Sequence, residues 1–102
     1  GEWRLCERSG WPDNQSFRNI LAWYWEKEEV RRLVVVNFSG SASQARVLLP
    51  WENLPGRTWR LVDGFSGEVY DRGGDDLSEN GLYVELGPWN FHLLRFQDHD
   101  WP

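Results

Sequence analysis

The chain has 102 residues, and its eleven basic and sixteen acidic side chains give a formal net charge of −5 at pH 7. This length predicts one domain, and the scattered basic residues argue against a nucleic-acid partner, which requires a basic stripe. The sequence contains neither a run approaching the ~20 apolar residues of a membrane span nor an N-terminal apolar region like that of a signal peptide, so no membrane partner is expected.

The first quarter of the chain predicts an edge strand, a loop and a longer strand. Residues 3–7 alternate between apolar and polar side chains, and residues 9–17 carry the Gly, Pro, Asn and Ser of a loop. Residues 19–26 are dense in aromatic side chains, which favours a strand, although a helix is the alternative for the same residues. The charged residues 27–29 predict a hairpin turn.

Residues 31–40 predict the central strand of the fold. Residues 33–36 are apolar, and three of them are valines, which pack well on a pleated surface. Such a short apolar run predicts a strand covered on both faces. Asn37 and Ser39 can bond the backbone nearby and Gly40 tolerates a positive φ, so we expect the strand to end there.

The second half of the chain predicts further short strands separated by turns. We expect strands over residues 44–49, 58–62, 68–70, 81–86 and 91–97. Residues 51–57 and the acidic residues 71–80 predict loops, and residues 98–102 a loose tail. The short turn at residues 87–90 predicts a hairpin between the last two strands. About eight short strands with regular turn signals are typical of an all-β sandwich or barrel.

The polar side chains do not predict a catalytic or metal site. Asp75 and Asp76 lie beside two glycines, which is typical of a solvated turn. His92 alternates with apolar residues along a strand, so we expect a histidine on a strand face that is hydrogen-bonded to a neighbouring residue. His99 falls in the tail and has no partner at zinc spacing. Cys6, the single cysteine, is expected to be a small buried hydrophobe. It excludes an internal disulfide and fits a reducing compartment, so a cytoplasmic location is favoured. No catalytic residue, metal or cofactor is predicted.

The eight tryptophans are the unusual feature of the composition. Trp23, Trp25 and Trp59 follow strand patterns and are expected in the core. The other candidates could stack on sugar rings, cap the ends of the sandwich or face another domain. These carbohydrate-binding or interdomain candidates lie at loops, turns or the tail: Trp11, Trp51, Trp89 and Trp101.

Three stretches, residues 19–39, 48–64 and 81–96, together resemble the C-terminal all-β domain of α-amylase-family glycoside hydrolases. The most specific elements are Val-Val-Asn-x-Ser at residues 35–39 and Gly-Leu-Tyr-x-x-Leu at residues 81–86, in that order. The resemblance covers nearly the whole chain. It implies a Greek-key β-sandwich over residues 1–102, with a core of about residues 3–97, as one domain of a larger enzyme.

The resemblance also implies where the function lies. In that family a catalytic (β/α)₈ barrel of ~250 residues carries the catalytic carboxylates, and the C-terminal domain packs against it. The chain is thus expected to be a non-catalytic accessory domain of a parent that hydrolyses or rearranges α-glucans, with the barrel as its partner. One alternative is a carbohydrate-binding module that stacks α-glucan on surface tryptophans. Another is an immunoglobulin-like interaction domain, although the Cys…Trp…Cys core is missing.

Overall fold

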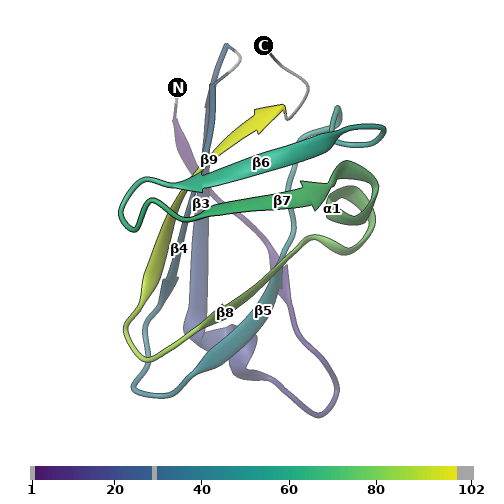
Figure 1. Cartoon of the computed structure of the whole chain (residues 1–102). Helices are drawn as coiled ribbons and strands as arrows, with labels where there is room; N and C mark the ends of the chain where they lie inside the picture. Colours follow the sequence, from purple (N-terminus) through teal and green to yellow (C-terminus); the bar gives the residue numbers. More distant parts are fainter. Residues whose placement is uncertain (1, 29, 99–102) are drawn as a thin grey trace.

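The computed structural model describes residues 2–28 and 30–98 as two antiparallel β-sheets that face each other, with a short helix, α1, at one end (Figure 1). The predicted all-β sandwich is confirmed, and the Greek-key connectivity stays a prediction. The larger sheet has the order β1-β3-β4-β9-β6-β7, and the smaller sheet has the order β2-β5-β8. The elements are β1 Trp3–Leu5, β2 Arg8–Ser9, the 3₁₀ helix η1 Ser16–Asn19, β3 Ile20–Lys27, β4 Val30–Asn37, β5 Ser43–Val47, β6 Thr58–Asp63, β7 Val69–Gly73, α1 Gly74–Asn80, β8 Leu82–Leu86 and β9 Phe91–Asp98.

The predicted central strand, β4, lies in the middle of the larger sheet. It pairs with β3 on one edge and with β9 on the other. Leu33 and Val35 are fully buried against the smaller sheet, whereas Val34 and Val36 point to the opposite side and are half-buried. The expectation that both faces of this strand are covered is wrong for this chain, because the smaller sheet covers only one side of the larger sheet.

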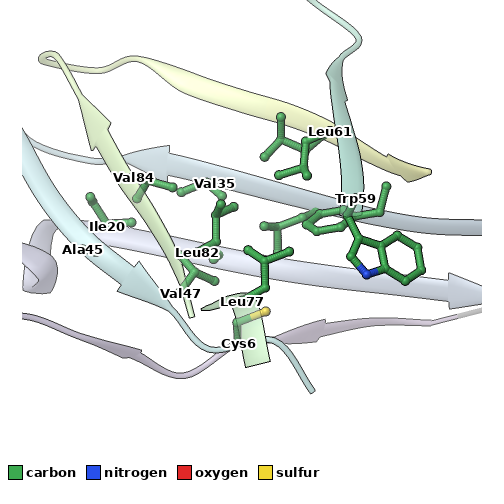
Figure 2. Close-up of a cluster of buried hydrophobic side chains, with 14 of the residues drawn as sticks. Cys6, Ile20, Val35, Ala45, Val47, Trp59, Leu61, Leu77, Leu82 and Val84 are labelled. Atoms are coloured by element: carbon green, nitrogen blue, oxygen red, sulfur yellow. The ribbon is translucent and has the colours of Figure 1, made fainter. Parts of the chain in front are cut away.

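The core consists of the inward-facing side chains of both sheets, part of which Figure 2 shows. Trp59 belongs to it as predicted, and its indole nitrogen donates a hydrogen bond to the backbone oxygen of Leu54 at 3.0 Å. Cys6 is also buried, and this burial raises the pKa of its thiol to about 11. The interpretation of Cys6 as a small buried hydrophobe is therefore confirmed.

The predicted loop over residues 71–80 is wrong. Strand β7 continues to Gly73, and α1 follows at once. The helix packs its first residue, Gly74, against the loop before β6, where an added Cβ would lie 1.7 Å from the backbone oxygen of Leu54. The helix has only seven residues, which is too short for a 3.6-residue periodicity to stand out.

The predicted hairpin between the last two strands is also wrong. Strand β8 pairs with β5 in the smaller sheet, whereas β9 lies between β4 and β6 in the larger sheet. The turn at residues 87–90 therefore carries the chain from one sheet to the other. The described residues form nine strands instead of about eight, because the two-residue strand β2 gave no recognisable pattern.

Candidate functional site

The side of the larger sheet that faces away from the smaller sheet is largely apolar. We call this side the outer face. Its exposed or half-buried apolar side chains come from β1, β3, β4, β6, β7 and β9: Trp3, Leu5, Leu21, Trp23, Trp25, Val34, Val36, Val62, Val69, Phe91 and Leu93. A contiguous apolar patch on the surface of a soluble protein commonly marks an interface.

The strand register makes the outer face continuous. Leu5, Trp23, Val34 and Leu93 are Cα partners in turn across β1, β3, β4 and β9, so one apolar row crosses four strands. Side chains directly opposite each other on one face of a sheet lie within contact range. Leu5 and Leu93, at the two ends of the row, are 62% and 39% exposed, so both ends of the row are open to solvent.

Aromatic side chains gather on and around the outer face. Trp3 and Trp25 have ring centroids 6.4 Å apart, and Trp23 meets Phe38, which follows β4, at the same distance. At the other end, Phe91 lies 5.0 Å from the ring of Phe65 in the turn between β6 and β7. Phe65 is 73% exposed, so the face ends in an aromatic side chain that projects into solvent.

Two tryptophans that were expected in the core belong to this face. Trp23 and Trp25 lie on the outward side of β3 and are only half-buried, so that prediction is wrong. The reason is that the inward positions of β3 are taken by Ile20 and Ala22, which are fully buried under the smaller sheet. Strand alternation then places the tryptophans on the uncovered side.

The tryptophans that were candidates for sugar stacking lie in different environments. Trp51 is 6% exposed and packs edge-on against Phe96 in the core, so it does not offer a surface platform. Trp11 is half-buried beside Tyr83 on the smaller sheet. Trp89, in the turn before β9, is 63% exposed. Trp101 lies outside the described residues.

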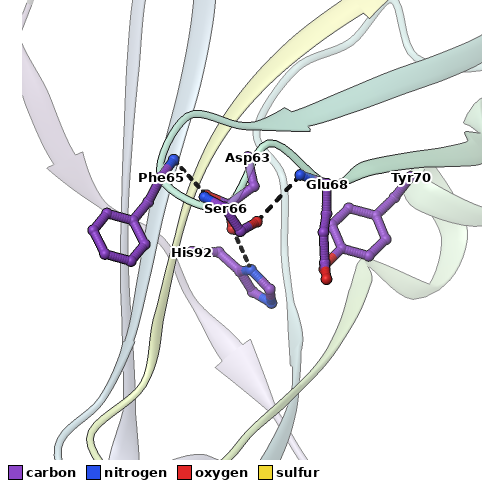
Figure 3. A network of polar contacts seen from close by, with 6 residues as sticks. All are labelled: Asp63, Phe65, Ser66, Glu68, Tyr70 and His92. Carbon is purple, nitrogen blue, oxygen red and sulfur yellow. Dashed lines mark hydrogen bonds and ion pairs between the residues drawn. The ribbon is translucent and has the colours of Figure 1, made fainter.

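A second candidate is a pocket of about 500 Å³ between β8 and the strands β6, β7 and β9. Asp63 lies in its wall, 2% exposed, and His92 Nδ1 donates to its carboxylate at 2.9 Å (Figure 3). Burial raises the pKa of Asp63, but this hydrogen bond and those from the backbone N–H groups of Phe65 and Ser66 bring the pKa below its usual value. The prediction of His92 as a histidine bonded to a neighbour is confirmed.

Several polar side chains of this pocket bond in pairs: Asp63 with His92, Tyr70 with Glu68 and Tyr83 with Glu85. The hydroxyl of Tyr70 donates to the carboxylate of Glu68, which, together with burial, raises the pKa of Tyr70 to about 12. The bond between Asp63 and His92 connects the turn between β6 and β7 to β9, so this network holds that turn in place against β9. Within the described part of the chain, no group of three or more His, Cys, Asp and Glu side chains could hold a metal ion.

Comparison with known proteins leaves the family open. No family model matches the chain, and no curated protein matches it at a significant level. Among residues 2–28 and 30–98, no helix is long and apolar enough to cross a membrane. Because no family match points to a function, the outer face is the feature of the chain that indicates one.

Proposed function

We propose that this chain is a non-catalytic accessory domain that packs its outer face against the catalytic domain of a larger, α-amylase-type glycoside hydrolase. The observation that carries the proposal is the apolar row across β1, β3, β4 and β9, which the smaller sheet leaves uncovered. The sequence resemblance supplies the identity of the partner, a catalytic barrel in the same parent chain. The reaction, hydrolysis or rearrangement of α-glucans, belongs to that barrel.

Packing against a second domain would remove the outer face from water. Burying apolar surface contributes about 25 cal/mol per Å², and interfaces between domains of one chain commonly cover about 600–1,500 Å². The side chains of Trp3 and Leu5, which are now about half exposed, would be among those removed from water. The accessory domain would thus stabilise itself and the barrel together.

A carbohydrate-binding module on surface tryptophans has less support. Of the tryptophans that were candidates for sugar stacking, Trp51 is buried and Trp11 is half-buried beside Tyr83, so these candidates do not form one exposed platform. Titration of the chain with a maltooligosaccharide, followed by tryptophan fluorescence, separates the two functions. We expect no change at millimolar ligand, where binding is worth only about 4 kcal/mol. A saturable change would favour the carbohydrate-binding module.

A pair of substitutions tests the docking proposal in the parent protein. Leu5→Glu places a carboxylate at the start of the apolar row of the outer face, and Tyr83→Glu places one on the outside of the smaller sheet. A charge buried without a partner costs several kcal/mol, so Leu5→Glu should lower the melting temperature of the parent by several degrees. Both variants should leave the isolated chain close to its native stability. Equal effects of the two substitutions on the parent would contradict the proposal.

A further inference from the structure

Two arginines face each other on the outer face. Arg32 on β4 and Arg95 on β9 are Cα partners, and both side chains are exposed. Neither forms an ion pair with any residue that the structure describes. Like charges directly opposite each other on a sheet destabilise it, so this pair lowers the stability of the fold unless a negatively charged group pairs with the arginines.

The charge of the outer face contrasts with that of the whole chain. Besides Arg32 and Arg95, its strand positions carry the basic residues Lys27 and Arg60 and one acidic residue, Asp71. The carboxylate of Asp71 already lies 3.2 Å from Arg60 Nε. The chain has a formal net charge of −5. The outer face is thus a basic side of an acidic molecule.

The arginine pair lies within the aromatic and apolar surface. Its row continues through Trp25 to Trp3 on one side and to Val62 on the other. The guanidinium carbon of Arg32 lies 5.7 Å from the ring centroid of Trp25. A guanidinium stacked on an aromatic ring keeps its in-plane N–H groups for an acceptor, and these suit a carboxylate in a bidentate arrangement.

We propose that the domain that covers the outer face brings an acidic side chain onto Arg32 and Arg95. This inference rests on the proposed function and adds the chemistry of the partner surface, which is apolar around at least one carboxylate. The surrounding apolar side chains would exclude water from the pair, so an unmatched arginine there would weaken docking strongly. A second copy of this chain fits poorly, because the one acidic residue at the described strand positions of its own outer face, Asp71, already lies against Arg60.

A thiol reporter in the parent protein tests the inference. Leu93→Cys introduces a thiol beside Arg95 on the outer face, and its alkylation rate, followed by peptide mass spectrometry, measures how often the face is uncovered. Cys6 is buried and does not interfere. The rate is compared between this protein, the same protein with Arg32→Gln and Arg95→Gln, and a charge-matched control with Arg18→Gln and Arg46→Gln. Arg18 and Arg46 lie outside the outer face.

We expect the arginine variant to react about tenfold faster or more, and the control to react at the unchanged rate. Urea denaturation of the isolated chain should show that losing the arginine pair does not destabilise the fold. If all three parent proteins react equally slowly, the acidic contact does not exist, while the docking proposal stands. If the thiol reacts as fast in the unaltered parent as in the isolated chain, the outer face is uncovered and both proposals fail.

Discussion

Asn37, at the end of β4, is fully buried, and its side-chain amide bonds both to the connection between β4 and β5 and to the chain at the end of β8. Its Nδ2 lies 2.8–3.0 Å from the backbone oxygens of Ser41, Leu86 and Gly87. Its Oδ1 accepts from the backbone N–H of Ser39 at 3.1 Å, as the sequence predicted. One side chain therefore ties the end of the central strand to the turn that changes sheets. Within the segment Val-Val-Asn-x-Ser, the asparagine therefore has a structural role in this fold.

Substitution of Asn37 should be among the most damaging polar changes in the chain. Asn37→Ala leaves buried carbonyl groups without a donor and should lower the free energy of unfolding by about 1–3 kcal/mol. Asn37→Asp should cost more, because a carboxylate would face those carbonyl oxygens. Urea denaturation of the isolated chain measures both, with the exposed Asn80→Ala as the control. Midpoints equal to the control would show that this amide is not the tie that we describe.

The buried Asp63 should make stability depend on acidic pH. Its pKa is lower in the folded chain than in the unfolded chain, where a value of about 3.9 is usual. Its ionised form therefore stabilises the fold above about pH 4, and this contribution is lost as the pH falls through the folded pKa. Asp63→Asn should reduce stability at pH 7 and flatten the loss of stability between about pH 5 and 2.

The exposed Asp13→Asn is the matched control for this experiment and should keep the acid-dependent loss of the native chain. Urea denaturation across that pH range measures all three proteins. An equally steep loss in Asp63→Asn and in the native chain would assign the acid sensitivity to other groups.

At the scale of elements, alternation and turn residues predicted most strands, while two features escaped. Helix α1 is too short for periodicity, but Asp75 and Asp76 in its first turn and Gly81 after its end, at φ 79°, are ordinary helix start and stop signals. The change of sheet at residues 87–90 could not be predicted from turn length, because a short turn serves a hairpin or a crossing equally well. At this crossing the backbone oxygens of Leu86 and Gly87 accept hydrogen bonds from Asn37, which is far away in the sequence.

Two adjacent glycines test how closely α1 packs. Gly74→Ala should lower the free energy of unfolding by about 1–3 kcal/mol, because its Cβ would overlap the backbone oxygen of Leu54. Gly73→Ala is the control, since nothing lies within 4 Å of an added Cβ there and its φ of −69° suits alanine. The two midpoints in urea measure the difference. If Gly74→Ala is as stable as Gly73→Ala, the helix does not rest on this loop.

At the scale of the whole molecule, the sequence showed an excess of tryptophans but not which of them would be exposed. Both faces of β3 are apolar, with Ile20 and Ala22 on one and Trp23 and Trp25 on the other. Alternation sorts these residues into two faces and does not say which face the smaller sheet covers. Of the loop tryptophans, Trp89 is exposed and Trp51 is buried, because burial of a loop residue depends on tertiary packing.

Hydroxyl-radical footprinting of the isolated chain and of the parent protein tests the central claim, that another domain of the parent covers the outer face, most directly. Trp3 and Leu5 report on the outer face, and Tyr83 on the smaller sheet is the internal reference. Docking predicts that Trp3 and Leu5 oxidise several-fold more slowly in the parent than in the isolated chain, while Tyr83 is unchanged. Equal oxidation rates of Trp3 and Leu5 in the two proteins would contradict the account.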